Sequence, residues 1–158
     1  MAADELKGFN ISTELVLINM VDLEDLFVSV LPLLQAIKKN RINIPFFSAG
    51  CSGTEKQSVS ACFAREDVPV VQELIHQEDR LRNRADTIHG VGLLSIYPHR
   101  SSLSFLGASI AALRNAGLPI YGLSSSISSL IFVLPYSRLE QAADSLKKGF
   151  SCIKNGGH

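Results

Sequence analysis

The strongest constraint on the fold is an internal repeat, because the two halves of the chain follow the same order of patterns. Short apolar stretches open the halves at residues 14–20 and 90–98, and each leads into a polar turn and a helical pattern. Several residue pairs keep one spacing between the halves: Leu17 with Leu93, Ile42 with Leu118, Ile44 with Ile120 and Ser48 with Ser124. A self-similar chain folds as repeated units. The sequence therefore predicts two related domains, residues 8–84 and 85–158.

Each half continues with two further strands and a second helix. The last of these strands is expected at residues 58–63 in the first half and 129–134 in the second. A fourth strand would complete a split β-α-β, ferredoxin-like unit. Residues 84–89 or 6–11 can supply it to the first half, and residues 151–154 can supply it to the second.

The predicted fold class is α+β: two ferredoxin-like βαββαβ units with antiparallel sheets and helices on one face. Gly117 follows a helical pattern in the second half, at the position where a left-handed residue usually ends a helix. Pro32 interrupts the helical pattern of residues 23–40, where an interior proline costs roughly 3 kcal/mol. Either that helix kinks at Pro32, or it begins near Pro32.

Charge and cysteine content exclude several classes of protein. Fifteen basic and fifteen acidic side chains cancel, so no broad positive surface for nucleic acid is expected. The three cysteines are widely spaced and form no CxxC motif, which predicts neither a disulfide framework nor a zinc site. No apolar run reaches the length of a membrane span, and the first residues, MAADELKG, lack the pattern of a signal peptide. We expect a cytoplasmic protein that uses no metal and no cofactor.

Two stretches resemble a known family. ALRNAGLPIYGLSSSISSLIFVLPYSRLEQAADSLKKGF (residues 112–150) resembles the second ACT domain of the aspartokinase regulatory region. LKGFNISTELVLINM (residues 6–20) resembles the start of the first ACT domain of that region. The likeness covers nearly the whole chain and leaves no room for a kinase domain. The resemblance therefore implies a pair of ACT domains without a kinase.

The resemblance implies a site for a small molecule, typically an amino acid. The site lies where the loop after the first strand of one ACT domain meets the second strand of a facing one. The positions that it assigns to the ligand are Met20, Val21, Asp22, Leu23, Asn43, Ile44, His99, Arg100, Ser101, Ile120, Ser124, Ser125 and Ser126. No catalytic residue and no metal ligand is among them.

Three of these assignments have structural alternatives. Asp22 can pair with the ammonium group of the ligand, or it can cap the N-terminus of the following helix. Arg100 can hold a carboxylate through two hydrogen bonds, or it can be an exposed loop arginine. The serines at 124–126 can bind the ligand, or their hydroxyls can satisfy the backbone of a turn.

The expected function is regulatory and not enzymatic. An amino acid bound at an ACT–ACT interface would change the association of the protein with a partner, such as a regulated enzyme in trans. Unpaired sheet edges predict a homodimer. The alternative is a dimerisation or protein-interaction module without a ligand site, which the missing glycine after Asp22 and the prolines Pro45 and Pro119 favour. A small enzyme with Cys51 as nucleophile is a third interpretation, although no histidine has a recognisable spacing to it.

Overall fold

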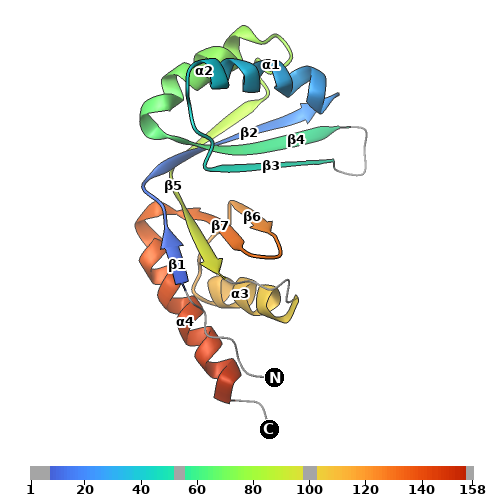
Figure 1. Cartoon of the computed structure of the whole chain (residues 1–158). Helices are drawn as coiled ribbons and strands as arrows, with labels where there is room; N and C mark the ends of the chain where they lie inside the picture. The colour runs from blue at the N-terminus through green and yellow to red at the C-terminus, as the bar shows by residue number, and fades with distance from the viewer. Residues whose placement is uncertain (1–7, 52–55, 98–102, 156–158) are drawn as a thin grey trace. The chain divides into compact units, whose positions relative to one another are not determined.

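The computed structural model describes residues 8–51, 56–97 and 103–155 (Figure 1). These residues form two compact units. The N-terminal unit is Glu14–His89, and the C-terminal unit combines Met1–Thr13 with Gly90–His158. The N-terminal unit spans residues 14–89, whereas the expected first domain spans residues 8–84.

The N-terminal unit has the strand order β3-β4-β2-β5. Its elements are β2 (Leu15–Leu23), α1 (Leu26–Lys39), β3 (Phe46–Cys51), β4 (Gln57–Ala64), a 3-10 turn η1 (Arg65–Asp67), α2 (Val68–Gln77) and the first residues of β5 (Ala85–Tyr97). Strand β4 pairs antiparallel with both β2 and β3. Helices α1 and α2 lie on the same face of this sheet (Figure 1).

The C-terminal unit has the same arrangement, with the strand order β1-β5-β7-β6. Its elements are β1 (Gly8–Ile11), the residues of β5 from Gly90 onward, α3 (Leu103–Asn115), β6 (Gly122–Ser125), β7 (Leu130–Pro135), a 3-10 turn η2 (Tyr136–Arg138) and α4 (Leu139–Asn155). All neighbouring strands in this unit are antiparallel. The predicted α+β class and the two βαββαβ-like units are confirmed.

The fourth strand of the N-terminal unit comes from an expected part of the chain, whereas that of the C-terminal unit does not. The start of β5 supplies it to the N-terminal unit, as one of the two alternatives predicted. Residues 8–11, the other alternative for the first half, instead pair with residues 94–97 in the C-terminal unit. The prediction of a strand at residues 151–154 is wrong, because α4 continues as a helix to Asn155. Phe9 packs against the core of the C-terminal unit, which fixes β1 there.

Each unit has its own apolar core between its sheet and its two helices. In the N-terminal unit, alternate residues of β2 and β4 face the helices, including Ile18, Met20 and Phe63. In the C-terminal unit, Ile96 of β5 and Phe132 of β7 take the same role. Burial of these side chains removes apolar surface from water, which stabilises the folded state by about 25 cal/mol per Å² of buried surface.

The helix ends follow the repeat. The Ile42 N–H donates to the Ile37 carbonyl at 3.2 Å, and the Leu118 N–H donates to the Leu113 carbonyl at 3.0 Å. The intervening residues with positive φ are Arg41 (56°) and Gly117 (64°). This hydrogen-bond pattern is a Schellman motif at each helix end. The predicted role of Gly117 is thus confirmed, and α1 runs through Pro32 from a start at Leu26.

The described residues contain neither a membrane-spanning helix nor a cluster of metal-ligating side chains. No helix in residues 8–51, 56–97 and 103–155 is both long enough and apolar enough to cross a membrane. In the same residues, no group of three or more His, Cys, Asp and Glu side chains is placed to hold a metal ion.

Candidate functional site

The strand end at Asp22 is the first place where expected ligand residues come together. The register of β2 against β4 shifts between Met20 and Leu23, so one extra residue forms a bulge there. Asp22 has a φ of 58°, in the left-handed region. Met20 and Leu23 are buried in the core, whereas Val21 and Asp22 are exposed. Of these four expected residues, Val21 and Asp22 therefore present their side chains to solvent.

Two cations flank Asp22. The Lys56 ammonium lies 3.4 Å from Oδ1 of Asp22. The Arg84 guanidinium donates through Nη1 to the backbone carbonyl of Asp22, and the Val21 N–H donates to the Arg84 carbonyl at 3.0 Å. Arg84 thus ties the bulge to the start of β5, while the Asp22 carboxylate remains at the surface with Lys56.

The cap of α1 is Asp25 and not Asp22. The Val28 N–H donates to Oδ1 of Asp25 at 3.0 Å, and the Leu26 N–H donates to Oε1 of Gln57 at 2.7 Å. Asp25 has the extended backbone that is usual for an N-cap residue. The alternative explanation of Asp22 as a helix cap is therefore wrong. Among the first three N–H groups of α1, only that of Phe27 has no acceptor in the described part of the protein.

Asn43 and Ile44 lie at the opposite end of the same sheet. They precede β3, whose first residue, Phe46, stands in register with Cys62 and, through it, Leu17. At the other end of these strands, Cys51 stands in register with Gln57 and Leu23. Asn43 is exposed and Ile44 is half-buried. Within the N-terminal unit, the structure therefore does not bring these two residues to Asp22.

The serine cluster lies at the β6–β7 connection of the C-terminal unit. Ser124 and Ser125 end β6, and Ser124 stands opposite Ile131, which stands opposite Ser95 of β5. This is the end of the sheet where β5 stops at Tyr97. His99, Arg100 and Ser101 lie outside the described residues.

Ser126 has a structural role in the turn. Its hydroxyl accepts from the Ser129 N–H at 3.1 Å, and its N–H donates to the Ser129 carbonyl at 2.8 Å. The Ser124 hydroxyl has no hydrogen-bond partner among the residues that the structure describes. Ile120 packs against the core of its unit.

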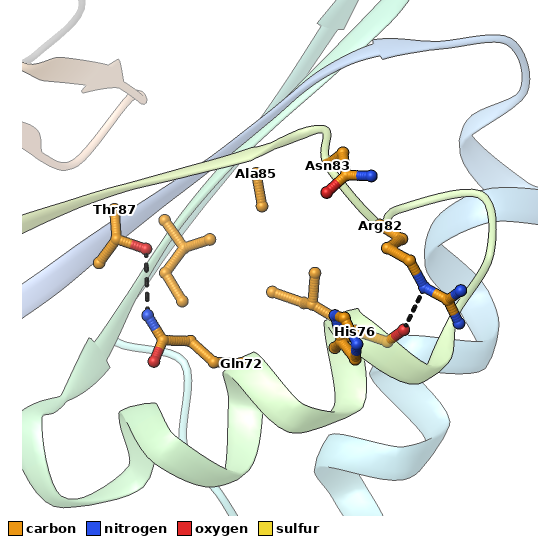
Figure 2. A pocket seen from close by; sticks show the side chains of 8 residues that line it. Gln72, His76, Arg82, Asn83, Ala85 and Thr87 are labelled. Carbon is orange, nitrogen blue, oxygen red and sulfur yellow. Dashed lines mark hydrogen bonds between the residues drawn. The ribbon is translucent and has the colours of Figure 1, made fainter.

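A separate pocket of about 250 Å³ lies in the N-terminal unit between α2 and β5 (Figure 2). We call it the α2–β5 pocket; its lining residues are Ile18, Gln72, Ile75, His76, Arg82, Asn83, Ala85 and Thr87. Gln72 and His76 project from α2, and the labelled residues opposite them come from the following loop and β5 (Figure 2). The Gln72 amide donates to the Thr87 hydroxyl at 3.4 Å.

No pattern in the sequence indicated this pocket. The charge pattern around Arg82 is typical of a solvated linker, and His76 stands beside the apolar stripe of its helix. The lining residues are scattered between positions 18 and 87, and they form no motif. The positive φ of Asn83, 63°, marks the loop as a tight turn only once the backbone is known.

No family model and no curated protein matches the sequence. Solved structures do match its fold. The ligand-free regulatory subunit of aspartate kinase from Thermus thermophilus superposes with a TM-score of 0.79 at 14% identity, covering 92% of this chain and 98% of that one. Aspartate kinase from Synechocystis gives a TM-score of 0.81 at 16% identity, covering 92% of this chain and 27% of that one.

Escherichia coli aspartokinase III, solved in complex with lysine and aspartate, gives a TM-score of 0.67 at 15% identity, with 92% of this chain and 33% of that one covered. The match to the Thermus subunit spans both chains almost completely, whereas the larger enzymes match over about a third of their length or less. The chain therefore has the fold of the regulatory ACT pair of aspartate kinase.

Proposed function

We propose that this protein is a non-enzymatic regulator that binds an amino acid at an interface between ACT domains. The fold of an aspartate kinase regulatory subunit over nearly the whole chain supports a regulatory role. One structural neighbour, aspartokinase III of Escherichia coli, was solved with lysine and aspartate. By analogy with that neighbour, we propose a free amino acid as the class of ligand for this protein.

The observation that carries the proposal is the state of Asp22. Its carboxylate does not cap α1, because Asp25 does. It stands at a bulge that Arg84 fixes through the backbone, and its side chain is 63% exposed. Its ion pair with Lys56 is exposed and hence weak, at about 0–1 kcal/mol. The ammonium group of an amino acid can therefore displace Lys56 at little cost.

The rest of the proposed site follows the expectation from the sequence. We place the remaining contacts at Val21, at Ser124 of a facing C-terminal unit, and at residues 99–101. A ligand that prefers one arrangement of the units shifts the population of that arrangement by its differential affinity. We propose that the protein is a cytoplasmic homodimer. We further propose that it regulates a separate enzyme in trans.

A melting screen against the twenty amino acids tests the proposal. A ligand that binds only the folded state stabilises it by about 2.7 kcal/mol at a hundred times its Kd. We expect one amino acid or a small group of them to raise the Tm, and Asp22→Asn to abolish this rise. Asp25→Asn is the matched control, because it removes the same charge three residues away and keeps a good N-cap.

A second function has one observation in its favour. The Leu26 and Val28 N–H groups at the start of α1, which a ligand carboxylate would use, already donate to Gln57 and Asp25. A module that only dimerises needs no free donors there. A dimer mass in solution together with a flat response to all twenty amino acids would select this alternative and reject the amino-acid site.

A further inference from the structure

Large apolar side chains are exposed together at the start of α1: Phe27 (76%), Val28 (47%) and Leu31 (48%). The helix that carries them covers one face of the sheet in the N-terminal unit (Figure 1). Contiguous exposed apolar residues mark surfaces that bind another molecule. Phe27, Leu31 and Gln35 follow one another at a spacing of four residues and are all exposed, so they lie on one face of the helix. We call this face the α1 ridge.

The corresponding face of α3 carries smaller side chains. The repeat spacing that pairs Leu17 with Leu93 assigns Leu103, Gly107 and Ala111 of α3 to the three positions of the α1 ridge. All three α3 residues are exposed. We call them the α3 face. The two units therefore present outward helix faces at equivalent positions, one bulky and one with small residues at its centre.

Gly107 is not required by the packing of its own unit. A Cβ at Gly92 would collide with Leu139, and a Cβ at Gly149 would lie 3.3 Å from that of Ala112, so close packing explains those two glycines. A Cβ at Gly107 would meet no atom within 4 Å in the described part of the protein. Because glycine inside a helix is destabilising relative to alanine, the absence of a side chain here calls for an explanation outside the unit.

The α1 ridge and the α3 face are complementary in an antiparallel register. If Leu31 of one helix is set against Gly107 of the other, Phe27 falls against Ala111, so each bulky side chain meets a small one. The same register sets Glu24, which precedes α1, against Arg114 in the last turn of α3. Glu24 and Arg114 are exposed, and neither forms an ion pair within residues 8–51, 56–97 and 103–155.

The two units also carry opposite net charges. The N-terminal unit, Glu14–His89, has eleven acidic and eight basic residues, and the rest of the chain has four acidic and seven basic residues. An N-terminal unit therefore attracts a C-terminal unit and repels another N-terminal unit. This complementarity favours the C-terminal unit of a second copy as the occupant of the α1 ridge.

We propose that two copies of this protein associate through the α1 ridge of each copy and the α3 face of the other, packed antiparallel. Phe27 and Leu31 contact Ala111 and Gly107 of the second copy, and Glu24 pairs with Arg114 of the second copy. Each copy supplies both faces, so the contact occurs twice and a twofold axis closes the assembly. The inference rests on the homodimer proposed above and names its contact surface, but it does not depend on amino-acid binding.

A charge swap tests the register. Sedimentation of the full chain over a dilution series measures the Kd of the dimer. Glu24→Arg and Arg114→Glu are each expected to raise this Kd at least about tenfold, because each sets like charges against one another. The double variant restores an opposite pair and is expected to regain most of the lost affinity. Unchanged Kd values in both single variants, or a double variant that dimerises no better than they do, would overturn the inference.

The controls for the charge swap make the same charge changes elsewhere. Glu66→Arg alters an exposed acid of the N-terminal unit, and Lys148→Glu alters an exposed base of α4. Both residues lie outside the α1 ridge and the α3 face, so the dimer Kd should stay within about threefold of the parent value. A loss in these controls as large as in Glu24→Arg would show that net charge alone holds the dimer, and would contradict the register.

Packing variants give a second arm of the test. Gly107→Leu places a good helix former where the chain has open space, so circular dichroism should show an intact fold. The new side chain would meet Leu31 of the second copy and raise the dimer Kd at least about tenfold. Phe27→Ala is expected to weaken the dimer as well, whereas Val70→Ala, at an exposed apolar residue of α2, leaves it unchanged. A Gly107→Leu dimer as tight as the parent would reject the interface.

This inference and the amino-acid site fail separately. A dimer that is insensitive to the charge and packing variants would retain the proposed homodimer and reject this interface. Recovery in the charge swap together with a flat melting screen would retain the interface and reject the amino-acid site. A chain that stays monomeric at every concentration would reject both the homodimer and this inference.

Discussion

The ammonium nitrogen of Lys56 lies 3.4 Å from Oδ1 of Asp22, and the two side chains are 59% and 63% exposed. An exposed pair of this kind contributes little to stability because water solvates both charges. Lys56 therefore occupies the place that we assign to a ligand ammonium without being needed for the fold.

Lys56→Met is expected to change the free energy of unfolding by less than about 0.5 kcal/mol. It should also strengthen the response to the bound amino acid, because the ligand no longer displaces a cation from Asp22. Urea denaturation measures the first effect, and the concentration that gives half of the Tm rise measures the second. A loss of more than about 1 kcal/mol would mean that the pair is structural.

The two helix ends at Arg41 and Gly117 predict opposite effects of substitution. Both residues have positive φ, which a side chain with a Cβ adopts at a cost of roughly 1–2 kcal/mol. Arg41→Gly is expected to stabilise the protein by about 0.5–1 kcal/mol, and Gly117→Ala to destabilise it by about 1 kcal/mol.

No atom lies within 4 Å of a Cβ placed on Gly117, so its cost arises from the backbone alone. Chemical denaturation of both variants beside the parent protein measures the two changes. Destabilisation of equal size in both variants would contradict the assignment, since Arg41 would then contribute through its side chain.

Phe9 should matter to the C-terminal unit although it lies near the start of the chain. It packs against the core there and stands opposite Ile96. Phe9→Ala is expected to cost about 2–3 kcal/mol, somewhat below the usual cost for a fully buried phenylalanine because the ring is half-buried. Hydrogen exchange should show faster exchange of the amides of residues 94–97.

The control for Phe9 is its neighbour Asn10, which is exposed on the same strand. Asn10→Ala should leave exchange in β5 nearly unchanged. If Phe9→Ala instead accelerated exchange only in residues 14–89, Phe9 would stabilise the N-terminal unit, and the prediction would be wrong.

Cys62 predicts a loss of stability at alkaline pH. Burial raises the pKa of the Cys62 thiol from 9.0 to about 12. Above pH 9.0 the unfolded chain releases the thiol proton and the folded protein keeps it, so the unfolded state binds fewer protons and stability falls as pH rises. The slope from one such group is up to about 1.4 kcal/mol per pH unit.

Cys62→Ala should therefore show a shallower decline of the free energy of unfolding above about pH 9 than the parent protein. Cys51→Ala is the matched control, because it makes the same substitution at an exposed cysteine. Identical slopes in all three proteins would show that the Cys62 thiol titrates as freely in the folded protein as in the unfolded chain.

Much of the fold was predictable because its signals are local. The paired positions of the repeat led to the matching helix ends at Arg41 and Gly117, which short-range hydrogen bonds close. The order of strands and helices in each half follows from apolar periodicity within about ten residues. The candidate site was predictable only in part: Asp22 was singled out, but the choice between Asp22 and Asp25 as the cap depended on a one-residue bulge.

The sequence by itself determined that this protein has two α+β units, where most of its helices and strands lie, and that it resembles an ACT pair. Only the tertiary structure decided that residues 8–11 complete the C-terminal unit, that residues 151–154 extend a helix, and that a pocket opens between α2 and β5. Strand pairing and pocket formation join residues far apart in the chain, and their free energy depends on which surfaces meet. Local sequence patterns do not predict which unit a strand joins, because the same short apolar strand fits the free edge of either sheet.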